Sequence, residues 1–204
     1  MTAKNKLEPQ FAAIVAGQHN NPFALLGPHT ANGGRVVRTL QPDAKRVTLV
    51  DGNGDTLAEM DKVHEGGLFE GQLPPRKRRY AFRIDWRSGE TSVEEDPYRF
   101  PSTLGEMDLY LLGEGSDLYI YRKLGSHIRE VQGVLGTRFA VWAPNASRVS
   151  LVGDFNSWDG RRHVMRLHPG NGIWEIFVPG VGNGALYKFE IQDSNGQLLP
   201  LKSD

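Results

Sequence analysis

Short runs in which apolar and polar residues alternate recur along the chain. Phe139 and Val141 fall on one face of such a run, and Tyr187, Phe189 and Ile191 fall on one face of a later run. A period of two places successive side chains on opposite faces of an extended strand. Glycine and proline, 24 and 12 in number, divide these runs into short pieces joined by turns. The pattern predicts about six to eight short antiparallel strands in each half of the chain.

The pattern of the first half repeats in the second half. Residues 34–38 and 42–50 (GRVVR, PDAKRVTLV) match residues 136–140 and 144–152 (GTRFA, PNASRVSLV) at a constant offset. Two later strings follow in the same order in both halves: GLFE at 67–70 and YAFRI at 80–84, then GIWE at 172–175 and YKFEI at 187–191. Internal repeats indicate repeated structural units. We therefore predict an all-β protein made of two tandem immunoglobulin-like antiparallel β-sandwiches.

Two segments have helical rather than alternating spacing. Phe11, Ile14 and Val15 share one helical stripe that Gly17 ends, and residues 104–112 are apolar at helical spacing before Gly113 and Gly115. We expect short packing helices at the N-terminus and between the copies.

These elements give four expected segments. They are an N-terminal helix (1–18), a first, degenerate sandwich (19–101), a helical linker (102–132) and a second sandwich (133–204). The first copy continues through EDPY at 95–98, whereas the second stops at Ser203 and Asp204. This difference indicates a cut rather than a natural end of the chain.

Charge and composition narrow the classes of partner. Lysine plus arginine equals aspartate plus glutamate at 24 each, so no net field favours nucleic acid or an anionic membrane. The basic run at 76–79 follows Pro75 and is interpreted as a solvated start of a strand. There is no cysteine, no apolar run near the ~20 residues of a membrane span, and no apolar signal core near the N-terminus. We expect a cytoplasmic monomer.

The sequence offers little that could perform catalysis. The six histidines form no i, i+4 pair, and no nucleophile elbow or phosphate-binding loop is present. Acidic residues such as those at 94–96 and Asp154 fall in expected turns, and none are paired around a bond as glycoside chemistry requires. We predict no metal, no cofactor, no catalytic residue and no enzymatic activity in this chain alone.

The strongest binding signal is the string GDFNSWDG at 153–160. An exposed indole is a natural platform for a sugar ring, and ~100 Å² of contact gives ~2.5 kcal/mol. Even a millimolar complex needs ~4 kcal/mol, so Trp158 needs a polar companion. Lys188 is the nearest candidate, on the face opposite to Tyr187 and Phe189. From spacing alone, an equal alternative is that Trp158 anchors the local core and Lys188 is solvated.

The remaining tryptophans suggest packing rather than binding. Trp142 and Trp174 lie in alternating strand segments and are expected to pack there, and Trp86 is assigned no role.

Several strings carry a resemblance to known families. VSLVGDFNSW at 149–158, GIWE at 172–175 and LYKF at 186–189 resemble a family 48 carbohydrate-binding module over residues 133–204. These modules precede the barrel of branching and debranching enzymes and also occur in glycogen-binding regulatory subunits. The whole chain resembles the two-module leader of the long bacterial glycogen branching enzymes, through NPFALLGPH (21–29), DPYRF (96–100), GTRFAVWAPNA (136–146), WDGRRHVM (158–165) and LKSD (201–204).

The resemblance implies roles for three residues. Trp158 is expected to stack on glucose rings and Lys188 to donate hydrogen bonds to their hydroxyls. Leu198 stands where strongly binding members carry a second tryptophan, which implies weaker binding. The first copy has GNGD at 52–55 in place of the aromatic loop, so it is expected to be a spacer or packing module.

The resemblance also implies the activity and partners of the parent enzyme. That enzyme cuts an α-1,4-glucan and rejoins the piece through an α-1,6 bond, using two carboxyl groups of a barrel that this chain lacks. The expected partners are α-glucan, as glycogen or maltooligosaccharides, and the enzyme's own catalytic barrel. Alternatives are a stand-alone glycogen-targeting protein, a structural leader without sugar binding, and a debranching relative.

Overall fold

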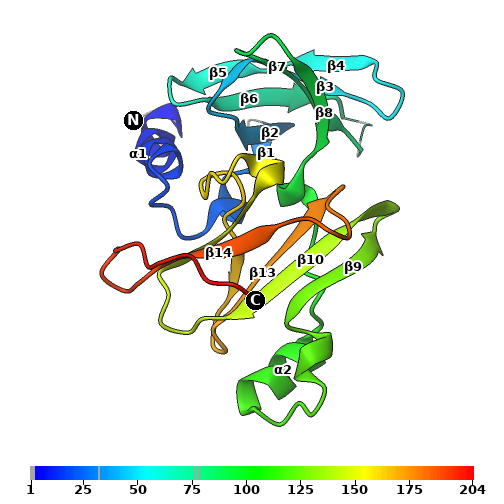
Figure 1. The fold of residues 1–204 in the computed structure, drawn as a ribbon. Helices are drawn as coiled ribbons and strands as arrows, with labels where there is room; N and C mark the ends of the chain where they lie inside the picture. The colour runs from blue at the N-terminus through cyan, green and yellow to red at the C-terminus, as the bar shows by residue number, and fades with distance from the viewer. Residues whose placement is uncertain (1–2, 32, 76, 78) are drawn as a thin grey trace. The chain divides into compact units, whose positions relative to one another are not determined.

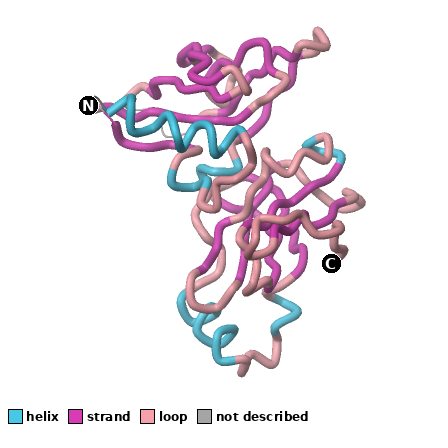
Figure 2. The backbone as a smooth tube through the Cα atoms, turned by 90° about the vertical axis from the view of Figure 1, so that its left-hand side faces the viewer, coloured by secondary structure: helices cyan, strands magenta, loops and turns pink. Residues whose placement is uncertain are grey.

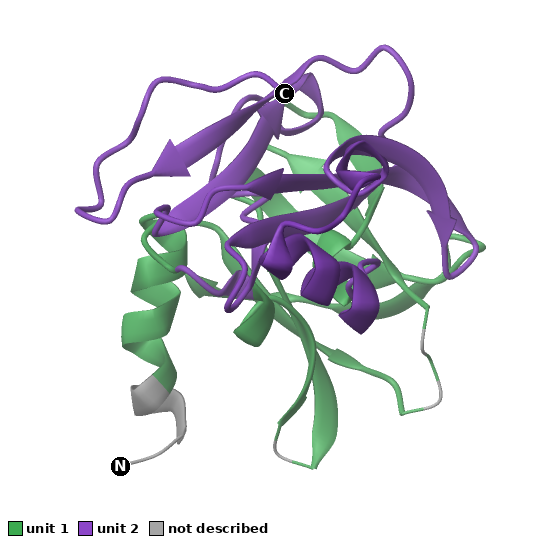
Figure 3. Cartoon of the chain, turned by 90° about the horizontal axis from the view of Figure 1, so that it is seen from below, with its two compact units in different colours: residues 1–19, 23–99 green, residues 20–22, 100–204 purple. Residues whose placement is uncertain are grey.

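A computed structural model describes residues 3–31, 33–75, 77 and 79–204. The chain divides into two compact units, residues 1–19 with 23–99 and residues 20–22 with 100–204 (Figure 3). The second unit thus includes the segment 102–132, which the sequence pattern assigned to a separate helical linker. Strands and loops make up most of the backbone, with few helical turns (Figure 2).

The first unit contains two antiparallel four-stranded sheets (Figure 1). One has the order β1-β2-β6-β5 and the other β4-β3-β7-β8. The strands are β1 (Gly27–Ala31), β2 (Gly34–Leu40), β3 (Ala44–Val50), β4 (Thr56–Glu59), β5 (Asp61–His64), β6 (Leu68–Leu73), β7 (Ala81–Trp86) and β8 (Thr91–Glu95), with 3-10 turns η1 (Pro22–Ala24) and η2 (Pro97–Arg99) near the two ends.

The core of the first unit lies between its two sheets. Val37 and Phe69 from one sheet pack in one buried cluster with Leu49, Phe82 and Ile84 from the other. Alternate residues of a strand reach the same face, so each sheet supplies every second side chain to this core. The arrangement is a β-sandwich, as predicted.

Helix α1 (Ala3–Val15) packs on the first unit through the predicted stripe. Phe11 and Ile14 are buried with Leu26, and Val15 packs against the same cluster. Gly17, with φ of 66°, follows the helix end as expected. Pro9 is the seventh residue of this helix, where its missing N–H removes one i→i−4 backbone hydrogen bond.

The second unit repeats this architecture with fewer strands. One antiparallel sheet has the order β12-β13-β10-β9, and β11 pairs with β14 in the other. The strands are β9 (Gly125–Val131), β10 (Val134–Trp142), β11 (Arg148–Gly153), β12 (Arg166–His168), β13 (Ile173–Pro179) and β14 (Tyr187–Gln192), with 3-10 turns η3 (Ile120–Arg122) and η4 (Asp154–Asn156). The Phe139 ring on β10 lies 4.7 Å from the Tyr187 ring on β14, which joins the two sheets.

The sequence repeat corresponds to equivalent strand pairs. In the first unit β2 pairs with β6 and β3 with β7, and in the second β10 pairs with β13 and β11 with β14. The all-β fold with two antiparallel sandwiches and short helices is therefore confirmed.

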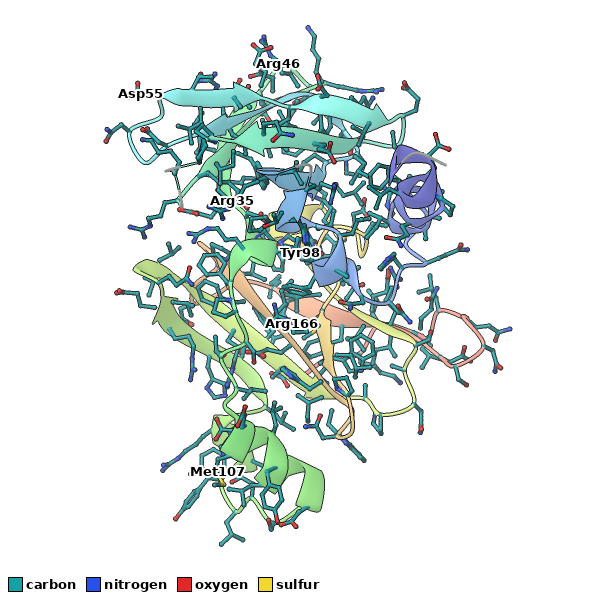
Figure 4. The ribbon with its side chains drawn as sticks, turned by 180° about the vertical axis from the view of Figure 1, so that it is seen from behind. Arg35, Arg46, Asp55, Tyr98, Met107 and Arg166 are labelled. Carbon is teal, nitrogen blue, oxygen red and sulfur yellow. The ribbon has the colours of Figure 1, made fainter. Side chains whose placement is uncertain are left out.

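The segment before β9 is attached to the sheet of the second unit by buried polar contacts. Helix α2 (Glu106–Glu114) ends at Gly115, whose φ is 69°, with Gly113 inside the helix. The Glu175 carboxylate of β13 accepts hydrogen bonds from Ser102 Oγ at 2.6 Å and from Thr103 N at 2.7 Å. Arg166 donates to the Phe100 carbonyl at 3.2 Å (Figure 4). Strand β9 then continues the sheet beside β10, which the expected helical linker did not include.

Two expectations from the residue pattern were wrong in detail. Trp174 is buried, but 61% of Trp142 is exposed at the end of β10, where its indole donates to the Asn171 carbonyl. Glu94 and Glu95 belong to strand β8 rather than to a turn, whereas Asp96 does begin the turn that contains η2 and is fully buried there. Asp96 accepts from the Tyr80 hydroxyl at 2.6 Å, which explains its burial.

Of the basic run, Arg76 and Arg78 lie outside the described residues, and Lys77 pairs with Asp51 at 3.1 Å. No helix among the described residues is long and apolar enough to cross a membrane.

Candidate functional site

The predicted site lies on the outer face of the sheet that contains β11 and β14. Short segments extend this sheet on both edges, because Ser150 of β11 bridges to Val164 and Phe189 of β14 bridges to Lys202. Phe189 is buried toward the sandwich core, so its neighbours Lys188 and Glu190 face outward.

The loop after β11 folds back over this outer face. The backbone of Gly160 lies directly against the Glu190 carboxylate. If residue 160 had a Cβ atom, that atom would stand only 2.1 Å from a carboxylate oxygen. Glu190 in turn pairs with Arg148 of β11 at 2.5 Å. The loop thereby buries Arg148 and Ser150, and it brings residues 154–162 beside the outward-facing side chains of β14.

A buried amide holds the loop in shape. Asn156 Oδ1 accepts from Gly153 N at 3.0 Å, and Asn156 Nδ2 donates to Leu151 O at 2.8 Å and to His163 Nδ1 at 2.9 Å. Burial lowers the pKa of His163 to about 3, so its ring is neutral and can accept this bond. One side chain thus ties the start of the loop to its end.

Trp158 lies in the middle of this loop and is partly exposed. Its backbone nitrogen donates to Gly153 O at 2.9 Å, and its indole nitrogen donates to Asp154 Oδ1 at 2.8 Å. Ser157 and Trp158 have φ of 56° and 58°, a left-handed conformation that costs a non-glycine residue about 1 kcal/mol or more. With 41% of its surface exposed, Trp158 is not a buried core anchor, and its indole edge is fixed by the bond to Asp154.

Lys188 lies on β14 opposite Val152, next to the Gly153–Tyr187 pair from which the Trp158 loop departs. The Lys188 side chain is half-buried, and its ammonium has no hydrogen bond or ion pair with the described residues. Because no described residue pairs with it, this ammonium is available to donate to a ligand oxygen.

Leu198 lies farther away along the same sheet. It bridges to Gln192 at the C-terminal end of β14, whereas Trp158 is bonded to Gly153 at the other end of the strand pair. Its side chain is 59% exposed. The three expected residues therefore belong to one sheet and its covering loop, with Trp158 and Lys188 near one end and Leu198 near the other.

The corresponding loop of the first unit contains no aromatic residue. Residues 51–55 form a tight turn in which Asp51 accepts from the backbone nitrogens of Asn53 and Asp55 and pairs with Lys77. These contacts close the turn on itself.

Sequence reasoning missed the two residues that prepare this site. Asp154 orients the indole, and Asn156 fixes the loop. Both stand in the same short string as Trp158, at i−4 and i−2, and their turn-forming character was the available signal. The exposed indole face of Trp158 can stack on a flat polyhydroxylated ring. The Lys188 ammonium, which has no partner among the described residues, can donate hydrogen bonds to the hydroxyls at the rim of that ring.

Comparison with protein families gives two matches that do not overlap. Residues 8–98 match the family described as alpha-1,4-glucan branching enzyme GlgB, N-terminal domain. Residues 123–204 match carbohydrate-binding module 48, the isoamylase N-terminal domain. The boundary between the matches falls in the segment that contains α2.

Curated relatives are branching enzymes that are much longer than this chain. The 1,4-alpha-glucan branching enzyme GlgB of Rubrobacter xylanophilus is 56% identical over 97% of this chain and 27% of its own length. That of Paramagnetospirillum magneticum is 54% identical over 94% of this chain and 26% of its own length. This chain thus spans about a quarter of these relatives and corresponds to their non-catalytic N-terminal region.

Solved structures show only a remote likeness. The crystal structure of pullulanase from Anoxybacillus sp. LM18-11 is 16% identical, covers 87% of this chain and 27% of that protein, and gives a TM-score of 0.28. That likeness is too low to support a conclusion. The two family matches and the branching-enzyme relatives agree instead: the chain belongs to the N-terminal region of the glycogen branching enzyme family, with a branching-enzyme N-terminal domain followed by a family 48 carbohydrate-binding module.

Proposed function

We propose that the second unit holds α-1,4-glucan for a glycogen branching enzyme. In this proposal Trp158 stacks on a glucose ring and Lys188 donates a hydrogen bond to its hydroxyls. The observation that carries it is a strained, tightly bonded loop that presents the Trp158 indole at the end of the strand pair where Lys188 lies, with no partner for Lys188 among the described residues, in a segment that matches a carbohydrate-binding family. Backbone strain maintained at one exposed aromatic is typical of a ligand site.

The affinity of this site is low. One indole face gives ~2.5 kcal/mol and a hydrogen bond adds about 1 kcal/mol, which together correspond to millimolar binding at best. Leu198 contributes a small apolar contact where a second indole would add another platform. A weak site is sufficient on a multivalent polymer, because it keeps many chain ends close to the rest of the enzyme.

The parent enzyme forms α-1,6 branches in glycogen biosynthesis by transferring α-1,4-glucan segments, and its own catalytic barrel is the partner of this region. In this proposal the first unit is a spacer or packing module that does not bind sugar. The closed Asp51 turn, in the place of the aromatic loop, supports this division of roles.

Migration in native gels that contain glycogen tests the proposal. Trp158→Ala removes the platform and should weaken retardation more than about tenfold, since the stack provides ~2 kcal/mol. Lys188→Ala should weaken it about fivefold, and Leu198→Ala about twofold. Trp142→Ala is the matched control, because Trp142 is also exposed in the second unit but lies away from this loop.

Two results would contradict the proposal. Retardation that survives in Trp158→Ala, or is lost equally in Trp142→Ala, would remove Trp158 from the site. Absence of retardation in the unmodified chain would leave both units as structural supports only.

A further inference from the structure

A cavity of about 380 Å³ adjoins the Trp158 loop. Asp154 and Phe155 line one side of it, and the loop between β13 and β14, residues 180–186, lines the other. Its volume falls within the ~300–1,000 Å³ of small-molecule sites. Asp154 lines this cavity, and its carboxylate also accepts the hydrogen bond from the Trp158 indole, so the cavity and the indole share one residue.

The loop 180–186 is fixed at its base and open at its tip. Gly180 N donates to Leu135 O at 3.0 Å, and the Val181 carbonyl accepts from the buried Thr137 hydroxyl at 2.7 Å. Asn183 at the tip is exposed, and its side-chain amide has no partner among the described residues. An amide carries both donors and an acceptor, which suits the hydroxyl groups of a sugar.

Leu186 continues the outward face of β14 toward this cavity. It precedes Lys188 by two residues and is 67% exposed, and its carbonyl lies 2.4 Å from where a Cβ of Gly153 would stand. Four side chains therefore lie near the Gly153–Tyr187 end of the strand pair, those of Trp158, Lys188, Asp154 and Leu186. Leu198 lies at the other end.

We propose that residues 180–186 form a second contact region for the glucan that Trp158 holds, with Asn183 bonding hydroxyls and Leu186 contacting an apolar sugar face. Asp154 connects the two regions through its free oxygen. This inference rests on the proposed function and assigns the direction in which the glucan extends: from Trp158 past Asp154 to the 180–186 loop. A short oligosaccharide fills the Trp158 region alone, and a longer one fills both.

NMR titration with maltotriose and with maltoheptaose tests this direction, because it measures millimolar dissociation constants. In the unmodified chain, maltoheptaose should bind about tenfold more tightly than maltotriose, and the Asn183 side-chain amide should shift only with maltoheptaose. In the double variant Asn183→Ala/Leu186→Ala, the dissociation constant for maltotriose should be unchanged. The advantage of maltoheptaose should fall to the factor that its larger number of glucose rings alone provides. Ile128→Ala is the control, since Ile128 lines the cavity on the other side of the 180–186 loop.

The outcomes separate the two proposals. If Trp158→Ala abolishes binding of both sugars while the double variant behaves as the unmodified chain, the second contact region is overturned and the Trp158 site stands. If the double variant weakens maltotriose and maltoheptaose equally, the loop supports the Trp158 site rather than extending it, and the inference also fails. If neither sugar shifts the Trp158 indole signal, the proposed function itself fails.

Discussion

At the scale of single residues, Gly67 and Gly172 show why the two copies have the same residue at equivalent positions. Each precedes a central strand, β6 or β13, and has a positive φ (92° and 68°). Each also faces the proline turn that follows the strand paired with it, β2 or β10. In each copy its carbonyl accepts from the residue before that proline, Gln41 or Ala143, at 2.8 and 2.9 Å. A side chain is excluded there by backbone contact as well as by φ.

Gly172→Ala should therefore lower the free energy of unfolding of the second unit by about 2 kcal/mol or more, because a Cβ would stand 2.6 Å from Pro144 Cα in a left-handed backbone. Gly170→Ala is a matched control: its φ is 95°, but nothing lies within 4 Å of a Cβ. Its cost should be limited to about 1 kcal/mol of strain. Urea unfolding followed by the fluorescence of the buried Trp174 measures both, and equal losses would show that the Pro144 contact is unimportant.

At the scale of elements, the loop 154–163 depends on Asn156 rather than on its own sequence propensity. Two consecutive left-handed residues oppose the loop conformation, and the three hydrogen bonds of the Asn156 side chain offset that cost. The position of Trp158 thus depends on Asn156, which is itself fully buried.

Asn156→Ala should cost about 2–4 kcal/mol of stability, since three buried polar groups lose their partner. It should also weaken retardation by glycogen more than about tenfold, because the indole is no longer held in place. Asn195→Ala, in the exposed hairpin after β14, is the control and should change neither property. Unfolding curves and native gels on the same samples measure the two properties. If Asn156→Ala lowers the stability but leaves the retardation by glycogen undiminished, the loop conformation is not needed for binding.

At the scale of the whole molecule, one buried titratable group in each unit responds to pH in the opposite sense. Burial raises the pKa of Asp96 in the first unit to about 6, although hydrogen bonds from Tyr80 and Tyr98 oppose the rise. Burial lowers the pKa of His163 in the second unit to about 3. The folded first unit therefore binds a proton more readily than the unfolded chain, and the folded second unit binds one less readily.

Between about pH 6.5 and pH 4, acidification should stabilise the first unit through Asp96 and destabilise the second through His163. The Asp96 contribution is complete below its unfolded pKa near 3.8 and is lost as pH rises through about 6. The His163 contribution is complete above about 6.5 and is lost as pH falls toward 3. Urea unfolding followed by amide NMR signals of each unit measures both trends.

Asp96→Asn and His163→Gln serve as controls for this pH response, because each removes one titration. Each variant should flatten the trend in its own unit only. A pH response that persists in both variants would assign it to other groups.

Much of this protein could be predicted from its sequence. Alternation and glycine–proline punctuation are local properties, and they suffice for short strands and for two copies of one sandwich. The position of Trp158 within a turn-forming string was also sufficient to mark it as a candidate. Trp142 shows the limit: its alternating segment predicted packing, yet it is exposed at the last residue of β10.

The sequence by itself determined the fold class, the repeat and the two matched families, because strand period, turn chemistry and family strings all lie within short stretches of chain. Only the tertiary structure decided that Trp158 is exposed and that Lys188 has no partner in the part of the chain that the structure describes. It also decided that Asp154 both bonds the indole and lines a cavity, and that Leu198 lies at the far end of β14. Each of these properties depends on residues that are distant in sequence and become neighbours only when β11 pairs with β14 and the loops close over them. Burial and hydrogen-bond partnership are properties of that packing, and no local pattern encodes them.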